Sequence, residues 1–439
     1  DAYIGNYGDN SLLYFDQYRN AKKGSPLHER ARTGTNVAKH GTFFDQLRSD
    51  VVGRTLPQVS WIVAPEAFTE HPNWPANYGA WYVSKVLDAL TADKDVWSRT
   101  ALFLTYDEND GFFDHVVPAY PNGADAPGAS TVATTHEHYA GPSGTAGHYG
   151  LGVRVPMLVV SPWSTGGWVC SETFDHTSLI RFIEARHGVT EPNITPWRRT
   201  VSGDLTAAFD FDRPKHPKLT LPSTAAYKPK DDKRHPDFVP TPPADPALPR
   251  QERGTRPSRA LGYRLVATPT VDTDGLSVEI ANRGRLGAAL QARPAGATGV
   301  PSTYTVGAGK HLTATFPAAG SYDVSLHGPD GFFRRYAGST TGAPVEVTMR
   351  ESGSGRGQLV VHNAGSTRAR VTVRDAHTGR QREHDVAAHG ERSVVVDGGH
   401  TGGWYDLAVT VEGDTAFARH LAGRLASREH GTTDPLLGR

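Results

Sequence analysis

In the first half of the chain, segments with hydrophobic residues at helical spacing alternate with short apolar runs typical of strands. The segment "NVAKHGTFFDQLRSDV" (36–51) carries apolar side chains three, four and seven positions apart, and "QVSWIVAP" (58–65) follows as a short apolar run. The same two patterns recur in "YGAWYVSKVLDAL" (78–90) and "TALFLTY" (100–106). We therefore predict two helices, each followed by a buried strand.

A third strand and a third helix are predicted farther along the chain. The run "VPMLVVSPW" (155–163) has the composition of a buried strand, and "DHTSLIRFIEARHG" (175–188) has a polar start and a glycine near its end, as helices do. Apolar strands separated by helices favour a parallel sheet covered on both faces. We predict an α/β domain over residues 1–212, whose ligands bind beyond the carboxyl ends of its strands.

The second half of the chain has a different pattern. Residues 213–258 are dense in proline and basic residues and predict a linker, and beyond them short alternating runs separated by Gly and Asn predict antiparallel strands. The segment 320–338 also matches the segment 403–423. We therefore predict two small antiparallel β-sandwich domains, over residues 259–345 and 346–439.

The two matched segments end in "FFRRYAG" and "AFARHLAG", which are the predicted closing strands of the two repeats. Their first aromatic residues are expected in the core. The arginines that follow, Arg334 and Arg419, are expected to reach solvent or a carboxylate.

Composition narrows the classes of protein. Lys plus Arg and Asp plus Glu number 46 each, so the charge balance gives no reason to expect a nucleic-acid partner. The single cysteine, Cys170, excludes an internal disulfide. No stretch approaches the roughly 18 apolar residues that span a bilayer, and the first residues show no signal-peptide pattern, so we expect a soluble chain.

Acidic residues gather where the strand predicted over 100–106 ends. Asp107 and Glu108 follow it directly, and Asp114 and His115 come seven residues later. Acids after a strand are often only a solvated turn or a helix N-cap. Two adjacent acids at the ligand edge of a sheet favour a site for a hard cation instead.

Three further polar residues lie near predicted strand and helix ends. His71 follows the run 58–65, and Asp175 and His176 open the helix predicted over 175–188. A surface or capping role is the plain alternative for each of them. The chain contains neither G-x-S-x-G nor the phosphate-binding G-x-x-x-x-G-K-[ST], which weighs against a serine esterase or an NTPase.

Long motifs of this sequence resemble those of a known family. The segments "TYDENDGFFDHV", "GLGVRVPMLVVSPWSTGGWVCSETFDHTSLIRFIE" and "TEHPN" resemble the bacterial phosphocholine-specific, non-haemolytic type of phospholipase C. That family is related to the metal-dependent acid phosphatases of the alkaline-phosphatase-like superfamily. The resemblance implies an alkaline-phosphatase-like α/β fold, incomplete in this chain, and the two C-terminal repeats look like the family's paired C-terminal domains.

The resemblance also implies a reaction and its residues. The expected activity is hydrolysis of the glycerol-side phosphodiester of phosphatidylcholine-like lipids, which releases diacylglycerol and a phosphorylated head group. By resemblance, Asp107 and Glu108 are metal ligands, His71 and His115 are catalytic, and Asp114 has a supporting role, as do Asp175 and His176. Oxygen-rich ligands favour Ca²⁺, Mg²⁺ or Mn²⁺, with Zn²⁺ or iron as the alternatives.

One part of the family pattern is not found in these residues. The family's first metal ligands and its threonine nucleophile stand upstream of anything that matches this chain, which therefore looks like the C-terminal two-thirds of the enzyme. The implied partners are an N-terminal fragment of the same precursor and a phospholipid surface, and the implied location is extracellular, as for a secreted bacterial enzyme.

Two other functions stay open on the sequence. One is a phosphomonoesterase of the same superfamily, that is, an acid phosphatase. The other is a non-catalytic fragment that binds lipid or glycan through its β-sandwiches.

Overall fold

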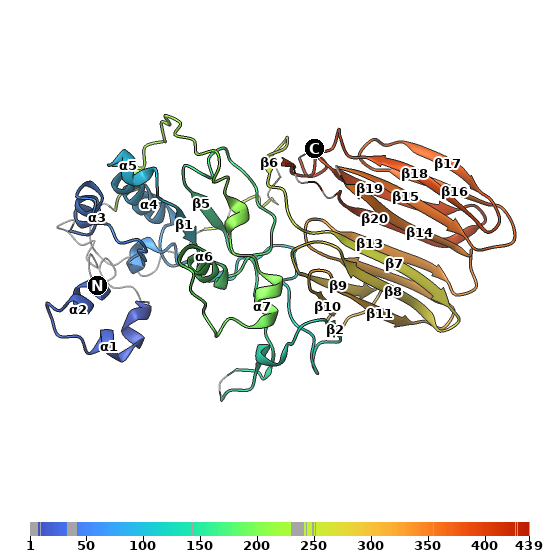
Figure 1. Ribbon diagram of the computed structural model, residues 1–439, viewed down its shortest axis with the longest axis horizontal. Coiled ribbons are helices and arrows are strands. Elements are labelled where there is room, and N and C mark those ends of the chain that lie inside the picture. The colour runs from blue at the N-terminus through green and yellow to red at the C-terminus, as the bar shows by residue number, and fades with distance from the viewer. Residues whose placement is uncertain are drawn as a thin grey trace. The chain divides into compact units, whose positions relative to one another are not determined.

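The computed structural model describes residues 8, 10–32, 42–142, 144–229, 241–242, 244–247, 250, 252–353, 355–425, 427 and 429–438. The chain divides into two compact units (Figure 1). The first consists of Asp1–Phe112, Pro156–Thr165 and Phe211–Pro249, and the second of Phe113–Val155, Gly166–Asp210 and Arg250–Arg439. Among the described residues, no helix has the length and apolar character needed to cross a bilayer.

The first unit is built mainly of helices. Its elements are η1 (Ser11–Tyr14), α1 (Asp16–Arg19), α2 (Pro26–Arg32), α3 (Thr42–Val52), η2 (Glu66–Phe68), α4 (Ala76–Leu90), α5 (Lys94–Trp97), β1 (Leu102–Thr105), β5 (Met157–Val160) and η5 (Ala225–Tyr227). The helices predicted over 36–51 and 78–90 are confirmed as α3 and α4, although residues 36–41 lie outside the described residues.

The core of the first unit forms between α3 and α4. Tyr82, Val86 and Leu90 lie on one face of α4 at helical spacing and are buried. They belong to one cluster with Leu47 and Val51 of α3. Burial of such side chains contributes about 1.5–3 kcal/mol each, which holds the two helices together.

The two strands of the first unit differ from the prediction in direction. β1 and β5 pair antiparallel, with Leu102 opposite Val160 and Thr105 opposite Met157, so the predicted parallel sheet is wrong for this pair. A run of apolar residues reads the same in either direction, and the sequence pattern therefore carries no information on strand polarity.

The strand predicted over 58–65 is also wrong. No strand is found there, and Trp61 in its centre is 65% exposed. A short apolar run becomes a strand only where a neighbouring strand accepts its backbone hydrogen bonds. In the described part of the first unit, β1 and β5 pair only with each other, so the run 58–65 has no strand partner there.

The second unit contains helices and most of the strands. Its helices are α6 (Thr177–His187) and α7 (Pro196–Val201), with the turns η3 (Thr135–Glu137) and η4 (Thr206–Ala208). Two short pairs are formed by β3 (His138–Tyr139) with β4 (Gly147–His148) and by β6 (Pro257–Ser258) with β21 (Gly431–Thr432). The helix predicted over 175–188 is confirmed as α6, which ends at Gly188 in the left-handed conformation.

The first repeat of the second unit comprises β7 (Leu265–Asp272), β8 (Gly275–Asn282), β9 (Ala288–Pro294), β10 (Ser302–Val306), β11 (His311–Pro317), β12 (Ser321–His327) and β13 (Phe333–Ser339). The second comprises β14 (Val345–Gly353), β15 (Arg356–Asn363), β16 (Ala369–Asp375), β17 (Gln381–Val386), β18 (Gly390–Asp397), β19 (Trp404–Val411) and β20 (Asp414–Arg424). Each repeat has its own hydrophobic core.

One nine-stranded sheet runs through both repeats. Its order is β17-β16-β19-β20-β13-β12-β9-β10-β2, and each repeat adds a separate three-stranded sheet, β11-β8-β7 or β14-β15-β18. The last strand of the large sheet, β2 (Gly128–Ser130), pairs in parallel with β10 although it comes from the region that the sequence assigns to the α/β domain. The domain boundaries expected at residues 212, 258 and 345 stay a prediction.

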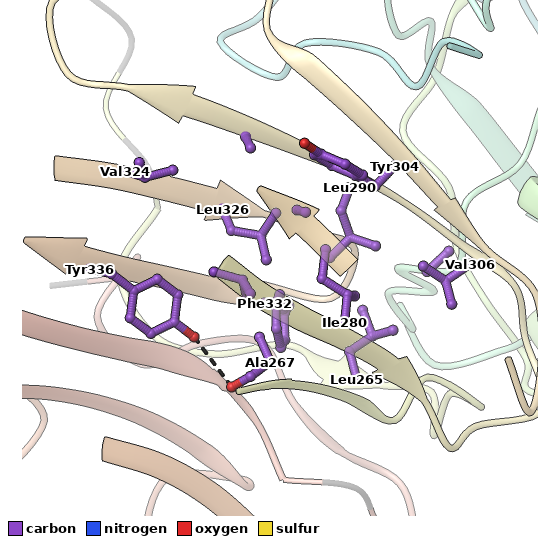
Figure 2. Packing of buried hydrophobic residues seen from close by; sticks show 14 of the residues in the cluster. Leu265, Ala267, Ile280, Leu290, Tyr304, Val306, Val324, Leu326, Phe332 and Tyr336 are labelled. Atoms are coloured by element: carbon purple, nitrogen blue, oxygen red, sulfur yellow. Dashed lines mark hydrogen bonds between the residues drawn. The ribbon is translucent and has the colours of Figure 1, made fainter. Parts of the chain in front are cut away.

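The core of the first repeat lies between side chains of its two sheets (Figure 2). Leu265 and Ile280 come from the three-stranded sheet, and Leu290, Val324 and Leu326 come from the nine-stranded sheet. The buried Tyr336 donates its hydroxyl to the Ala267 carbonyl oxygen at 3.2 Å, so its polar end is satisfied inside the core.

The expected exposure of Arg334 and Arg419 is wrong. Both are 2% exposed, and each crosses to the other repeat, where Arg334 donates to the Tyr405 hydroxyl at 2.8 Å and Arg419 to the Tyr322 hydroxyl at 2.7 Å. Each guanidinium also lies over the ring of the aromatic two residues before it, Phe332 or Phe417. The repeated sequence thus encodes a reciprocal contact between its two copies.

Candidate metal centre

Three side chains of the first unit converge at the carboxyl end of β1. His71, Glu108 and Asp110 each offer one ligand atom, and these atoms all lie within 4.8 Å of one another. Opposite ligands of an ion bound at 2.0–2.6 Å are about 4–5 Å apart, so the spacing fits a divalent cation. We call these three residues the His71 cluster.

The segment that carries His71 is held by the preceding residue, Glu70, whose backbone is in the left-handed conformation. Glu70 has φ 65°, and its carboxylate accepts a hydrogen bond from the Tyr106 hydroxyl just beyond β1. A Cβ on Gly79 of α4 would lie 2.4 Å from Glu70 Cγ, so glycine is needed there to make room. Burial, and then Glu70, raise the pKa of Tyr106 to about 12, which keeps Tyr106 a hydrogen-bond donor.

The His71 ring is oriented by a neighbour that the sequence reading did not single out. His71 Nδ1 lies 2.6 Å from Asn73 Oδ1. With Nδ1–H donating to that oxygen, Nε2 keeps the lone pair that a metal requires, an arrangement common among metal-binding histidines. The signal for Asn73 was its position two residues after the histidine in "TEHPN".

A tight turn after β1 brings in the third member of the cluster. Phe112 N–H donates to the Asn109 carbonyl oxygen at 2.7 Å, and Asn109 Nδ2 donates to the Phe112 carbonyl oxygen at 3.0 Å. Within this turn Asp110 has φ 48°, an uncommon conformation that asparagine and aspartate tolerate. The turn formed by "ENDG" (108–111) and Phe112 therefore places Asp110 near Glu108 and His71.

The predicted ligand Asp107 has a different position from Glu108. Asp107 is exposed, and its Oδ1 accepts the Glu108 backbone N–H at 3.1 Å. The structure brings Glu108 together with His71, while Asp107 stands beside the cluster in sequence without belonging to it. Its role as a ligand stays a prediction.

Asp114, which was predicted to have a supporting role, and His115, which was predicted to be catalytic, belong to the second unit. Asp114 forms an ion pair with Arg154, and this hydrogen bond is the main cause that lowers the pKa of its carboxyl. His115 is exposed to solvent.

Asp175 and His176 stand at the start of α6. Asp175 accepts the Thr177 backbone N–H at 3.0 Å and the Thr177 hydroxyl at 2.6 Å, and Arg198 Nη1 donates to its other oxygen at 2.9 Å. These contacts tie α6 to α7 and match the capping alternative for Asp175. His176 is exposed.

Comparison with known proteins places the chain in a class. Residues 1–190 match the phosphoesterase family, and residues 257–339 and 342–424 each match the C-terminal domain of bacterial phospholipase C. The chain is therefore similar to the phosphoesterase family over its first 190 residues and to that C-terminal domain over two further segments. The resemblance found in the sequence motifs is confirmed.

Individual relatives make the comparison more specific. The chain is 49% identical over 454 aligned residues to the "Non-hemolytic phospholipase C" of Burkholderia pseudomallei and 42% identical over 459 to that of Pseudomonas aeruginosa. It is 39% identical over 475 residues to the "Hemolytic phospholipase C" of Pseudomonas aeruginosa. These alignments cover 98–100% of this chain but 63–65% of the relatives, so the chain spans less than two-thirds of their length.

Proposed function

We propose that this chain acts as part of a metal-dependent phospholipase C that hydrolyses the glycerol-side phosphodiester of phosphatidylcholine-like lipids. The observation that carries the proposal is the His71 cluster at the end of β1, inside a phosphoesterase-family region whose relatives are named phospholipase C. The products are diacylglycerol and a phosphorylated head group. We further propose that the enzyme is secreted and acts at a phospholipid surface.

Each residue of the cluster has a proposed task. Glu108 and Asp110 supply two negative oxygens, and His71 supplies Nε2 while Asn73 holds its ring. A divalent cation bound there would polarise the phosphoryl oxygens and lower the pKa of a hydroxyl nucleophile. For the exposed His115 we keep the catalytic role that the resemblance implies, as a proton donor in the complete enzyme.

The nucleophile and the remaining ligands are proposed to come from an N-terminal fragment of the same precursor. Three ligand atoms from the described residues leave further positions around a cation open. The relatives extend beyond the part that this chain covers, which leaves room for such a segment in the proposed enzyme.

The decisive experiment follows the bond that is cleaved. Phosphatidylcholine vesicles are incubated with the complete enzyme in H₂¹⁸O, with and without EDTA, and the water-soluble product is examined by mass spectrometry. We expect ¹⁸O in phosphocholine, release of diacylglycerol, and loss of both with EDTA. Labelled phosphatidate with free choline would overturn the proposed bond, and turnover that is unchanged by EDTA would overturn the metal dependence.

The phosphomonoesterase alternative is separated by two chromogenic substrates. A phospholipase C turns over p-nitrophenyl phosphocholine faster than p-nitrophenyl phosphate, whereas an acid phosphatase has the reverse preference. Vesicle co-sedimentation without any phosphocholine release would favour the non-catalytic alternative instead.

A further inference from the structure

The second unit contains a cavity of about 620 Å³ that the proposed reaction does not use. One wall comes from α6, α7 and the residues before and after them, and the other from the first repeat and the residues after β2. All of its lining residues belong to the second unit, whereas the His71 cluster belongs to the first. The cavity shares no residue with the His71 cluster, and we treat it as a second candidate site.

Basic side chains converge on this cavity. Arg285 and Lys310 lie on the first repeat, and the side chain of neither makes a hydrogen bond or ion pair with any other residue that the structure describes. Arg181 of α6 lines the opposite wall, where the carbonyl oxygens of Arg199 and Ser202 accept hydrogen bonds from its Nη1. Two uncommitted cations and one fixed guanidinium thus face a shared space, which attracts an anion.

Two polar side-chain groups of the lining make no hydrogen bond with the residues that the structure describes. The Ser202 hydroxyl is in a residue only 2% exposed, and within the described part of the chain it has no hydrogen-bond partner. The Glu172 carboxyl packs so closely on Gly203 that a Cβ there would lie 1.9 Å from Glu172 Oε1. Buried polar groups are rarely left unsatisfied, so both observations suit a ligand that brings its own donors and acceptors.

The protonation state of Glu172 decides whether this side chain attracts or repels an anion in the cavity. Burial, and then the nearby Asp204, raise the pKa of Glu172 to about 7. At and below neutral pH a large part of this carboxyl is protonated and can donate a hydrogen bond, whereas the ionised form repels an anion. Asp204 is itself engaged, because it accepts the Thr206 backbone N–H at 3.0 Å and the Thr206 hydroxyl at 2.5 Å.

We propose that this cavity is a binding site for a doubly charged phosphate monoester, held by Arg285, Lys310 and Arg181, with protonated Glu172 as a further donor. The inference goes beyond the proposed phospholipase C function and does not rest on it. The guanidinium groups match the geometry of phosphate oxygens, and Lys310 adds a point charge. The cavity of about 620 Å³ is large enough for a small phosphorylated molecule.

The first test measures anion binding without metal. Isothermal titration calorimetry of the full chain with inorganic phosphate and with phosphocholine is done in EDTA, so that the His71 cluster holds no cation. We expect Arg285→Gln and Lys310→Gln each to weaken binding about 10-fold, the effect of losing one hydrogen bond to a charged group. The exposed Arg283, in the same turn but outside the lining, is the matched control, and Arg283→Gln should bind like the wild type.

Two outcomes of this experiment overturn the site. One is an absence of saturable binding by both probes at millimolar concentration. The other is an equal loss in Arg283→Gln and in the two cavity variants, which would show that only the general surface charge matters. Circular dichroism checks folding, and Lys310 is exposed, so its variant remains informative if Arg285→Gln does not fold.

The second test uses sulfate, whose charge stays constant where phosphate titrates. The charged and titratable groups around Glu172 are Asp204, Arg181, Arg285, Arg199, Lys310, Tyr263 and Cys170. We expect sulfate affinity to fall from about pH 6 to about pH 8 as Glu172 ionises, and Glu172→Gln to remove this dependence. A pH profile that is the same in Glu172→Gln and the wild type would contradict the role of Glu172.

Discussion

At the scale of single residues, the candidate metal centre depends on which acid after β1 faces His71. Glu108 and Asp110 do so in the structure, and Asp107 instead accepts the backbone N–H of its neighbour. The arrangement combines two carboxylates with one imidazole, a donor set that suits Mn²⁺ and Zn²⁺ as well as harder cations. The turn at residues 109–112 is therefore part of the site.

The first prediction separates the two aspartates. Asp110→Asn keeps the size of the side chain but removes a negative charge from the cluster, so we expect metal affinity to fall at least about 10-fold, more than in Asp107→Asn. Competition with a fluorescent chelator measures the affinity. Asp88→Asn, an exposed aspartate on α4, is the control. A larger loss from Asp107→Asn than from Asp110→Asn would restore the ligand pair predicted from the sequence.

Sequence reasoning found two members of the cluster and missed one. His71 and Glu108 could be predicted because each follows an apolar run, and ligands are expected at the end of such a run. Asp110 could not be predicted, because its place depends on a left-handed conformation within the turn at residues 109–112. Asn73 was missed for a similar reason, since its contact with His71 depends on local backbone geometry.

At the scale of elements, α6 and α7 are joined by a charged contact. Arg199 Nη1 and Nη2 donate to the two oxygens of Glu184 at 2.9 and 2.7 Å. This pair lowers the pKa of Glu184 to about 2, below the usual value of about 4.3. The stability that it contributes is present above about pH 4.3 and is lost as the pH falls through about 2.

The second prediction follows from this dependence of stability on pH. Glu184→Gln should lower the urea midpoint relative to the wild type at neutral pH, and the difference should shrink as the pH falls below about 4, where Glu184 of the unfolded chain takes up its proton while Glu184 of the folded chain is still ionised. Urea titrations at several pH values measure it. Glu279→Gln, on an exposed position of β8, should show no such trend. A difference that stays constant down to about pH 2 would assign the effect of Glu184 to packing rather than charge.

Element types were more predictable than element partners. The helical spacing of residues 78–90 and 175–188 gave α4 and α6, because one apolar face is visible in the sequence. The direction of β5 and the addition of β2 to the sheet of the first repeat depend on residues far away in the chain. Apolar patterning records burial, and it does not record which strand lies next to which.

At the scale of the whole second unit, the repeats are connected by a shared sheet and two buried arginines. β13 pairs with β20, and Arg334 and Arg419 cross this junction to Tyr405 and Tyr322. Internal similarity was visible in the sequence, but the crossing was not, because a repeat shows that two copies exist and not how they meet.

The third prediction tests this crossing. Tyr405→Phe and Tyr322→Phe each leave a buried guanidinium without one acceptor, so we expect each to destabilise the second unit by about 1–3 kcal/mol, with similar values for the two. Urea unfolding followed by circular dichroism provides the measurement. As a control, Asp323→Asn removes the partially exposed pair with Arg335 and should cost at most about 1 kcal/mol. Two unfolding transitions in the wild type, one for each repeat, would contradict the coupling.

The fourth prediction concerns the apolar side chains that the first unit leaves exposed. Val59, Trp61 and Val63 are 41%, 65% and 40% exposed, and Leu158 of β5 is 51% exposed. Large apolar patches seldom face water in stable proteins, and among the described residues the strand pair β1-β5 has no further strand at either edge. Under the proposed function, the N-terminal fragment of the precursor is the segment that covers them.

Hydrogen exchange compares the complete enzyme with these 439 residues alone. We expect the backbone amides of residues 58–65 and of β1 to exchange at least about 10-fold more slowly in the complete enzyme, because added strands would pair with them and exclude water. The strands β15 and β16 in the second unit are the internal reference, and their exchange should be equal in the two samples. Equal exchange at residues 58–65 would show that another partner, or none, covers this surface.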